Sequence, residues 1–327
     1  MLKKNLIPII IFLALILISA LYFFSNHNGT LSEKEASFAC SDLSEVTDIS
    51  IKNGNSVFVL NRKNNNWYFN SKYIVKPSLM SLCYRIFSQV EIKSAVSKKA
   101  SPMIVEKIAK YGTEISLLKE NKILKHYFIW ADTQHQNIYM MMVDKEVPFI
   151  VTLPSFQGNF AALFRNDPKF WRDLTILHYT PAQIATVKVE QTGNENQSFK
   201  LDISSRGKTI LTDLKFGKAH TFKTEAVEAY LFCFRNIKAE NYIEKSDETI
   251  KKLKRTLPLF KVSVMDHEGN NISLEIFPKE SETSSSKRSE SNSDVNFCYV
   301  LINEKELAVA KYIETDPITR DLKFFLQ

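Results

Sequence analysis

Two segments of the sequence, which we call the acidic phrases because each carries two aspartates, contain residue types that could form a catalytic or ion-binding site. The first is NDPKFWRDLTIL at residues 166–177, and the second is TDPITRDLKFFL at residues 315–326. Each combines an Asp-Pro turn with an Arg-Asp pair, so carboxylates suited to acid–base chemistry would lie beside a guanidinium that can pair with them. The positions that match between the phrases are Asp167, Pro168, Arg172 and Asp173 in the first and Asp316, Pro317, Arg320 and Asp321 in the second.

The spacing within these phrases indicates a structural role instead. Arg172 follows Asp167 by five positions, whereas Arg320 follows Asp316 by four. A catalytic geometry tolerates such a slip poorly, because the reacting groups must be held in near-attack positions. Asp before Pro is typical of a turn, so we expect both phrases to be the closing turns of two equivalent units, each followed by apolar residues that fill a core.

Histidine and glycine lack the spacing that common catalytic and cofactor sites need. None of the 6 histidines forms an H-x-x-x-H or H-E-x-x-H pattern. The closest pair among the 8 glycines, Gly207 and Gly217, is ten residues apart, which disfavours Rossmann, P-loop and nucleophile-elbow enzymes. We therefore predict no enzyme, with no catalytic, cofactor-binding or metal-binding residue.

The 4 cysteines contain no C-x-x-C pair. Cys83 and Cys233 fall in apolar helical segments and Cys298 in a strand-like run, where cysteine packs as a small hydrophobic residue. We expect buried thiols at these positions. Disulfides among them and Cys40 stay open as the alternative for a chain outside the cytoplasm.

An uncharged apolar segment near the N-terminus predicts where the protein resides. Residues 6–24 (LIPIIIFLALILISALYFF) carry no charge over 19 positions. As a helix they would cover about 28 Å, close to the thickness of the hydrocarbon core of a bilayer. Lys3 and Lys4 precede the segment and its downstream flank is uncharged, so residues 1–5 are expected in the cytoplasm and the rest across the membrane.

A cleaved signal peptide is the alternative to this anchor. Such a peptide needs a shorter apolar core and a small-x-small cleavage site. The nearest match is Ile18-Ser19-Ala20, which bulky residues follow. We favour an uncleaved single-pass anchor in the cell inner membrane, with the bulk of the chain in the periplasm.

The composition predicts folded domains and gives no support for nucleic-acid binding. The chain has 327 residues, of which 44% are hydrophobic and 12% aromatic, enough for about two domains with real cores. The net charge of +7 is spread along the chain. The densest basic run, KKLKR at residues 251–255, is expected to be the solvated face of a helix.

Two stretches of the chain repeat one pattern of predicted elements. Strand-like segments at residues 46–53 and 184–191 have apolar residues at the same spacing. Segments 76–90 and 223–237, related by a shift of 147, each place seven apolar or amphipathic residues on one helical stripe. A second short helix (near residues 102–110 and 248–256) and a meander of strands follow in both copies.

These patterns predict an α+β fold class, in which an N-terminal transmembrane helix is followed by two tandem duplicated units. Each unit is expected to pack a core helix on an antiparallel meander sheet. The predicted bounds are a linker at 25–42, repeat 1 at 43–177 and repeat 2 at 178–327, with a flexible Ser-rich loop at 279–294.

Several of these segments together resemble a known family. They are VTDISI (residues 46–51) after a single anchor, WYF (67–69), the meander, and FQGNF…WRDL (156–174). The sequence is similar to an uncharacterised bacterial (bacteroidete-type) membrane-anchored repeat-domain family of unknown function, some members of which are linked to gliding-motility-type ABC transporters. The resemblance implies an envelope location and an accessory role, and it supplies no catalytic residue.

Three hypotheses of function follow. The first is a non-catalytic periplasmic protein, held in the inner membrane by residues 6–24, that acts as an interaction or accessory subunit of a cell-envelope complex and binds another envelope protein. The second is a periplasmic binding module for a peptide, lipid or glycan in a cleft between the repeats. The third is a hydrolase with dispersed residues, for which Asp167, Arg172 and Asp173 are the first candidates. No small-molecule ligand is identified.

Overall fold

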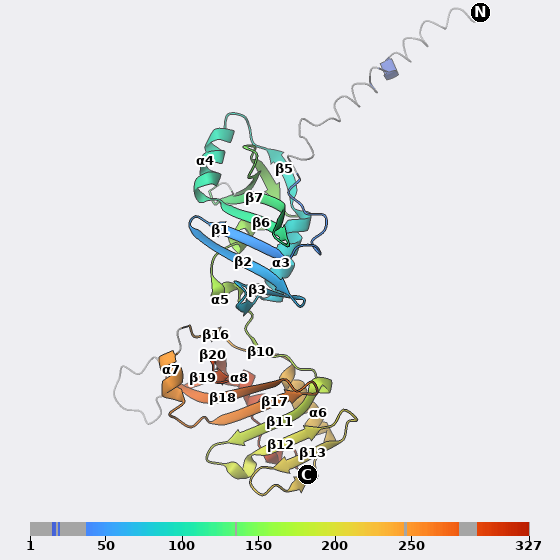
Figure 1. Ribbon diagram of the computed structural model, residues 1–327, viewed down its shortest axis with the longest axis vertical. Coiled ribbons are helices and arrows are strands. Elements are labelled where there is room, and N and C mark those ends of the chain that lie inside the picture. Colours follow the sequence, from blue (N-terminus) through green and yellow to red (C-terminus); the bar gives the residue numbers. More distant parts are fainter. Residues whose placement is uncertain are drawn as a thin grey trace, which may run out of the picture. The chain divides into compact units, whose positions relative to one another are not determined.

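The computed structural model describes residues 15–17, 19, 37–134, 136–244, 247–280 and 293–326. Within them the chain is a mixed α+β protein with two large antiparallel sheets and few helices (Figure 1). It divides into two compact units, residues 1–173 (unit 1) and 174–327 (unit 2). The prediction of an α+β class is confirmed.

The predicted anchor at residues 6–24 lies outside the described residues except for 15–17 and 19, which are helical. Residues 1–5, most of the predicted linker at 25–42 and most of the predicted Ser-rich loop at 279–294 lie outside them as well. No helix among the described residues has the length and apolar character that a membrane crossing requires.

Unit 1 is built on a nine-stranded antiparallel sheet in the order β4-β3-β2-β1-β6-β7-β8-β9-β5. Inward and outward side chains alternate along the central strands, as a sheet with one apolar core face requires. The strands are β1 (Asp48–Asn53), β2 (Ser56–Lys63), β3 (Asn66–Phe69), β4 (Tyr73–Ile74), β5 (Glu91–Ala95), β6 (Thr113–Lys119), β7 (Lys122–Asp132), β8 (Asn137–Met142) and β9 (Phe149–Thr152).

Two helices cover opposite faces of this sheet. Helix α3 (Pro77–Gln89) starts with a proline, which suits the first helical turn, and buries Met80, Cys83, Ile86 and Phe87 against the main core. Helix α4 (Ser101–Tyr111) packs on the other face in a second cluster. Strand β8 is therefore buried on both sides, because its alternate residues belong to the two different clusters.

Unit 2 has a second nine-stranded antiparallel sheet, in the order β14-β13-β12-β11-β17-β18-β19-β20-β16. Its strands are β11 (Ile184–Gln191), β12 (Phe199–Ile203), β13 (Thr209–Asp213), β14 (Ala219–His220), β16 (Asn241–Tyr242), β17 (Phe260–Asp266), β18 (Asn271–Glu280), β19 (Ser293–Ile302) and β20 (Glu306–Lys311). Helix α6 (Thr224–Phe232) packs on the main core, and α7 (Asp247–Leu253) packs in a separate cluster. Taken in chain order, the strands of the two sheets follow one and the same sheet order.

Short helical turns complete both units. In unit 1 they are η2 (Phe160–Leu163) and α5 (Pro168–Trp171). In unit 2 they are η3 (Pro181–Gln183), η4 (Glu195–Gln197), η5 (Cys233–Arg235), α8 (Tyr312–Thr315), η6 (Asp316–Ile318) and η7 (Leu322–Phe324).

The joint between the units consists of two adjacent residues that are bonded to different units. The Asp173 N–H donates to the Ile74 carbonyl of unit 1 at 2.7 Å, and the Leu174 carbonyl accepts from the Ala239 N–H of unit 2 at 2.8 Å. Strand β10 (Thr175–Leu177) then pairs with β15 (Ile237–Lys238) in unit 2. The division therefore falls four residues before the predicted boundary at 177, because main-chain pairing assigns this apolar segment to the second core.

Candidate functional site

The first acidic phrase closes unit 1. The carboxylate of Asp167 accepts a hydrogen bond from the Lys169 N–H at 3.0 Å and so caps α5. The guanidinium of Arg172 lies over the ring of Tyr73 at 4.4 Å. Trp171, between them, is fully buried, and its indole N–H donates to the Arg165 carbonyl at 2.8 Å. These contacts tie the end of unit 1 to the segment that leads into α3.

The second phrase forms two turns at the end of unit 2. Asp316 and Pro317 lie in η6, where the Asp316 carbonyl accepts from the Thr319 N–H at 3.3 Å. Asp321 precedes η7. The guanidinium of Arg320 lies 5.4 Å from the centre of the Phe324 ring.

A buried aromatic residue marks the equivalent position at the end of each unit. The residue before each core helix, Lys76 in unit 1 and Lys223 in unit 2, donates its N–H to the carbonyl of Trp171 and of Phe325, at 2.8 and 2.9 Å. Each of these two aromatic side chains is fully buried in its own core. Trp171 and Phe325 therefore occupy the same place in the two units.

The equivalence of Trp171 and Phe325 gives an alignment of the two phrases that differs from the one predicted from their sequences. Counting back from the aromatic residue places Asp167 opposite Asp321, and Asp316 has a different place in η6. The main chain agrees, because the Asp167 carbonyl accepts from Phe170 N–H at 3.1 Å and the Asp321 carbonyl from Phe324 N–H at 3.0 Å. The matching Asp-Pro pairs are thus not structurally equivalent.

Other titratable side chains form cross-strand or turn contacts. On the sheet of unit 1, Glu114 lies 2.8 Å from Nε2 of His126 and 3.2 Å from Nζ of Lys52. Partial burial raises the pKa of Glu114, but the hydrogen bonds from His126 and Lys52 outweigh it and hold this pKa below its usual value. Within the described part of the chain, no group of three or more His, Cys, Asp or Glu residues is placed to hold a metal ion.

A carboxylate in unit 2 organises the turn between β13 and β14. Asp213 accepts from the Phe216 N–H at 2.6 Å, from the Lys218 N–H at 3.2 Å and from Nε2 of His220 at 2.9 Å. The hydrogen bond from Phe216 is the largest of the effects that lower the pKa of Asp213. The role of this side chain is to hold a turn.

The cysteines are free thiols. Cys40, Cys83 and Cys298 are buried, which agrees with the expectation for the last two, and burial raises the pKa of Cys298 to about 11. Cys233, expected to be buried, is partly exposed: it follows α6 in a 3-10 turn, packs against the edge of the core and donates to the Ala229 carbonyl at 3.4 Å.

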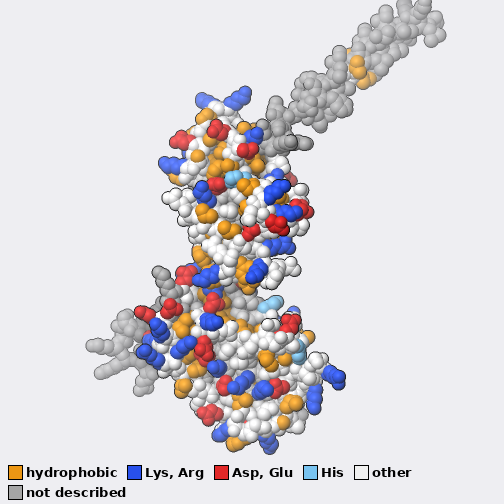
Figure 2. All heavy atoms as spheres, in the orientation of Figure 1, with side chains coloured by type: hydrophobic (Ala, Val, Ile, Leu, Met, Phe, Trp, Pro, Cys, Tyr) orange, Lys and Arg blue, Asp and Glu red, His pale blue; other side chains and the backbone are white. Residues whose placement is uncertain are grey.

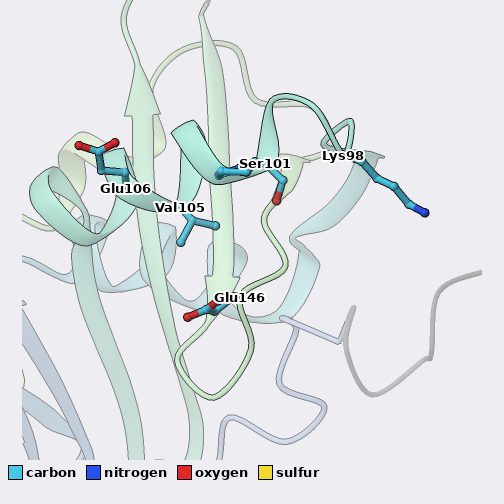
Figure 3. A pocket seen from close by; sticks show the side chains of 6 residues that line it. Lys98, Ser101, Val105, Glu106 and Glu146 are labelled. Carbon is cyan, nitrogen blue, oxygen red and sulfur yellow. The ribbon is translucent and has the colours of Figure 1, made fainter.

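A shallow open hollow of about 540 Å³ lies beside α4 in unit 1 (Figure 3). In Figure 3, Val105 points toward the loop that carries Glu146, and the side chain of Lys98 extends away from the helix. The residues that line the hollow are Lys98, Ser101, Pro102, Val105, Glu106 and Glu146. This region was not predicted to be a site; the sequence feature next to it is the lysine-containing run KSAVSKK at residues 93–99.

Exposed aromatic and arginine side chains gather on unit 2 along α6. Phe232 is 54% exposed and Phe324 is 40% exposed. The guanidinium of Arg235 lies 5.7 Å from the Phe232 ring centre, and that of Arg320 lies 5.4 Å from the Phe324 ring centre. Burial raises the pKa of the Cys233 thiol, and the charge of Arg320 partly offsets this rise. We call these residues (Phe232, Cys233, Arg235, Arg320 and Phe324) the aromatic surface. The apolar residues Leu322, Phe324 and Phe325 after the second phrase were all expected to fill the core; Leu322 and Phe325 do so, whereas Phe324 is exposed.

Comparison with known proteins places the chain in a family. Residues 85–256, more than half of the sequence, match the family described as Domain of unknown function (DUF4340). The chain belongs to this family. The DUF4340 segment begins within α3 of unit 1 and ends just after α7 of unit 2, so it crosses the joint between the units. The predicted resemblance to an uncharacterised family is confirmed at this level. No curated protein and no solved structure matches the chain.

Proposed function

We propose that the protein is a non-catalytic accessory subunit of a cell-envelope complex. In this proposal residues 6–24 anchor it in the inner membrane, units 1 and 2 lie in the periplasm, and another envelope protein, such as a transporter subunit, is the partner. The observation that carries the proposal is that the chain contains two units with the same strand order. The joint between them lies inside the segment that matches the DUF4340 family.

The common strand order supports an origin by duplication of one α+β unit. Because the DUF4340 segment crosses the joint, the part that matches the family comprises the second half of unit 1, the joint and the first half of unit 2. A shared tandem arrangement fits a scaffold that presents surfaces to a partner. A bacteroidete-type origin and a link to gliding-motility-type transporters are proposed on the sequence resemblance.

The aromatic surface of unit 2 is the proposed contact with the partner protein. Aromatic and arginine side chains are enriched at protein interfaces and dominate their binding energy. Here two exposed phenylalanines lie under guanidinium groups, so they offer apolar area together with positive charge. The residues next to the two phenylalanines in the chain, Leu231 and Phe325, are buried in the core of unit 2, which fixes the main chain that carries them.

Affinity purification of the tagged full chain from gently solubilised membranes tests the proposal. We expect co-purification of one or a few envelope proteins in defined proportion. Replacement of Phe232 and Phe324 by serine is expected to lower the partner yield at least tenfold. The matched control is Phe216→Ser, which removes a ring that is 76% exposed in the turn between β13 and β14. Recovery of the wild-type protein without a partner would contradict the proposal.

A further inference from the structure

The point at which the described chain enters unit 1 is fixed by packing. Phe38 is buried, with its ring centre 6.1 Å from that of Tyr127 and 5.9 Å from that of Phe149. The preceding carbonyl, of Ser37, accepts a hydrogen bond from Nζ of Lys125 at 2.6 Å. The chain therefore enters beside the start of β9.

The connection from β5 to α4 starts at the same place. Ala95, the last residue of β5, pairs with Phe149 across the sheet, and residues 96–100 then lead to α4. Figure 1 shows this connection and α4 at one end of unit 1. Because Phe149 contacts both Phe38 and the end of β5, the chain entry and the β5–α4 connection share one edge.

This edge is basic and carries exposed apolar side chains. Lys93, Lys98 and Lys99 are all exposed, and we call them the basic edge. Met103 at the start of α4 is 52% exposed, and Val147 just before β9 is 40% exposed. Figure 2 shows basic and hydrophobic side chains together at this end of unit 1. Two carboxylates, Glu106 and Glu146, line the open hollow beside α4 together with Lys98 of the basic edge.

The fold does not require this basic character. Unit 2 has β16 in the place of β5 and α7 in the place of α4. Residues 91–99 contain three lysines and one glutamate, whereas residues 240–248 contain four acidic residues and one lysine. Two edges with the same topology thus have opposite charge, so the lysines of unit 1 serve something other than the sheet.

The tether keeps this edge close to the membrane. The predicted anchor ends at Phe24, and twelve residues lie between it and Ser37. A chain of that length reaches at most about 45 Å when fully extended. The entry edge of unit 1 therefore stays near the lipid headgroups, at a local concentration that allows weak contacts to form.

We propose that the basic edge docks on the anionic phospholipid headgroups of the membrane that holds the anchor, with Met103 and Val147 entering the headgroup layer. The inference rests on the anchor at residues 6–24 that forms part of the proposed function. A lysine near an anionic surface contributes about a fivefold gain in binding, so three lysines are expected to contribute roughly a hundredfold. This gain falls as salt screens the surface.

Hydrogen–deuterium exchange on the full chain in nanodiscs tests the proposal. The probes are discs of phosphatidylcholine and discs that also contain phosphatidylglycerol. We expect residues 91–103 to exchange at least fivefold more slowly in the anionic discs. The triple variant Lys93→Gln, Lys98→Gln, Lys99→Gln should lose this protection, while the control Lys251→Gln, Lys252→Gln, Lys254→Gln on α7 should keep it. Unchanged exchange in β1 and β6 shows that each variant is folded.

Equal exchange of residues 91–103 in both kinds of disc would overturn the inference, and so would protection that high salt leaves intact. Alkaline carbonate extraction separates this failure from a failure of the anchor. A protein that resists extraction but shows no lipid-dependent protection refutes the docking edge alone. A protein that carbonate releases refutes the anchored state on which the proposed function depends.

Discussion

The two units follow one strand order, yet they place their buried aromatic rings on different elements. Tyr127 on β7 of unit 1 corresponds to Leu274 on β18 of unit 2. Cys83 on α3 of unit 1 corresponds to Tyr230 on α6 of unit 2. The large ring has moved from the strand to the helix. Cores tolerate such exchanges when the total volume is kept. The shared order therefore fixes where the core lies, whereas each unit fills it with its own set of side chains.

The exchange also changes how a buried hydroxyl is treated. The hydroxyl of Tyr230 donates to the Ile318 carbonyl at 2.8 Å. The hydroxyl of Tyr127 is fully buried and has no hydrogen-bond partner within the described part of the chain. A buried polar group without a partner costs stability. Unit 1 therefore carries an unpartnered hydroxyl on its strand, whereas unit 2 carries a hydrogen bond between its core helix and its closing turn.

The largest test of the correspondence is to remove the closing aromatic residue of each unit. Trp171→Ala and Phe325→Ala are each expected to lower the free energy of unfolding of the affected unit by about 3–5 kcal/mol, because each empties a fully buried site. Urea denaturation followed by hydrogen exchange of each core measures this. Phe324→Ala is the matched control and should cost less than about 1 kcal/mol, since its ring is 40% exposed. Equal losses for Phe324 and Phe325 would break the correspondence.

The buried tyrosines should respond in opposite ways to loss of the hydroxyl. Tyr230→Phe leaves the Ile318 carbonyl without its donor, and we expect a loss of about 1–2 kcal/mol in the stability of unit 2. Tyr127→Phe removes an unpartnered group, and we expect no loss or a small gain in unit 1. Thermal unfolding of both variants decides the point. A comparable loss in Tyr127→Phe would show that its hydroxyl has a partner.

The aspartates of the two phrases should differ in how much their carboxylates contribute to stability. Asp167→Ala removes the cap of α5, so a loss of about 1 kcal/mol is expected in unit 1. Asp316→Ala is expected to cost less, because the main-chain carbonyl of Asp316, and not its carboxylate, accepts the bond from Thr319. Chemical denaturation of the two variants gives the comparison. A larger loss of stability for Asp316→Ala would favour the alignment predicted from sequence, in which Asp316 corresponds to Asp167.

Low pH should destabilise the sheet edge formed by β13 and β14 in unit 2 more than the corresponding edge formed by β3 and β4 in unit 1. The pKa of Asp213 lies below its ordinary value of 3.8 in the folded state, so its contribution is present above that pH and is lost as the pH falls through the lower, folded value. In unit 1 the amide oxygen of Asn70 accepts from the Val59 N–H at 2.9 Å, and an amide does not titrate. Hydrogen exchange below pH 3.8 is expected to rise at β13 and β14 before it rises at β3 and β4. Asp213→Asn should abolish this difference.

Periodic apolar positions made much of this architecture predictable. The predicted core helices at 76–90 and 223–237 correspond to α3 and to α6 with η5, because an apolar stripe at helical spacing must face a core. The short helices near 102–110 and 248–256 correspond to α4 and α7 for the same reason. The closing turns were harder to predict, because the Asp-Pro pairs match in sequence, whereas the equivalent hydrogen bonds in the structure are made by Trp171 and Phe325.

Properties that depend on distant contacts could not be predicted in this way. The pairing of β10 with β15 joins segments about sixty residues apart, so the apolar tail of the first phrase looked like the end of the first unit. The basic edge becomes visible only when β5 is placed beside β9 and the chain entry. Whether an aromatic ring is buried or exposed, as for Phe325 and Phe324, depends on one step of helical rotation.

The joint at Asp173 and Leu174 has a mechanical consequence. Each of these adjacent residues is hydrogen-bonded within a different unit, so the covalent path between the units contains no spare length. A pull along the main chain at this point is therefore borne first by the hydrogen bonds of Asp173 to Ile74 and of Leu174 to Ala239. A longer linker would extend before its flanking hydrogen bonds were loaded.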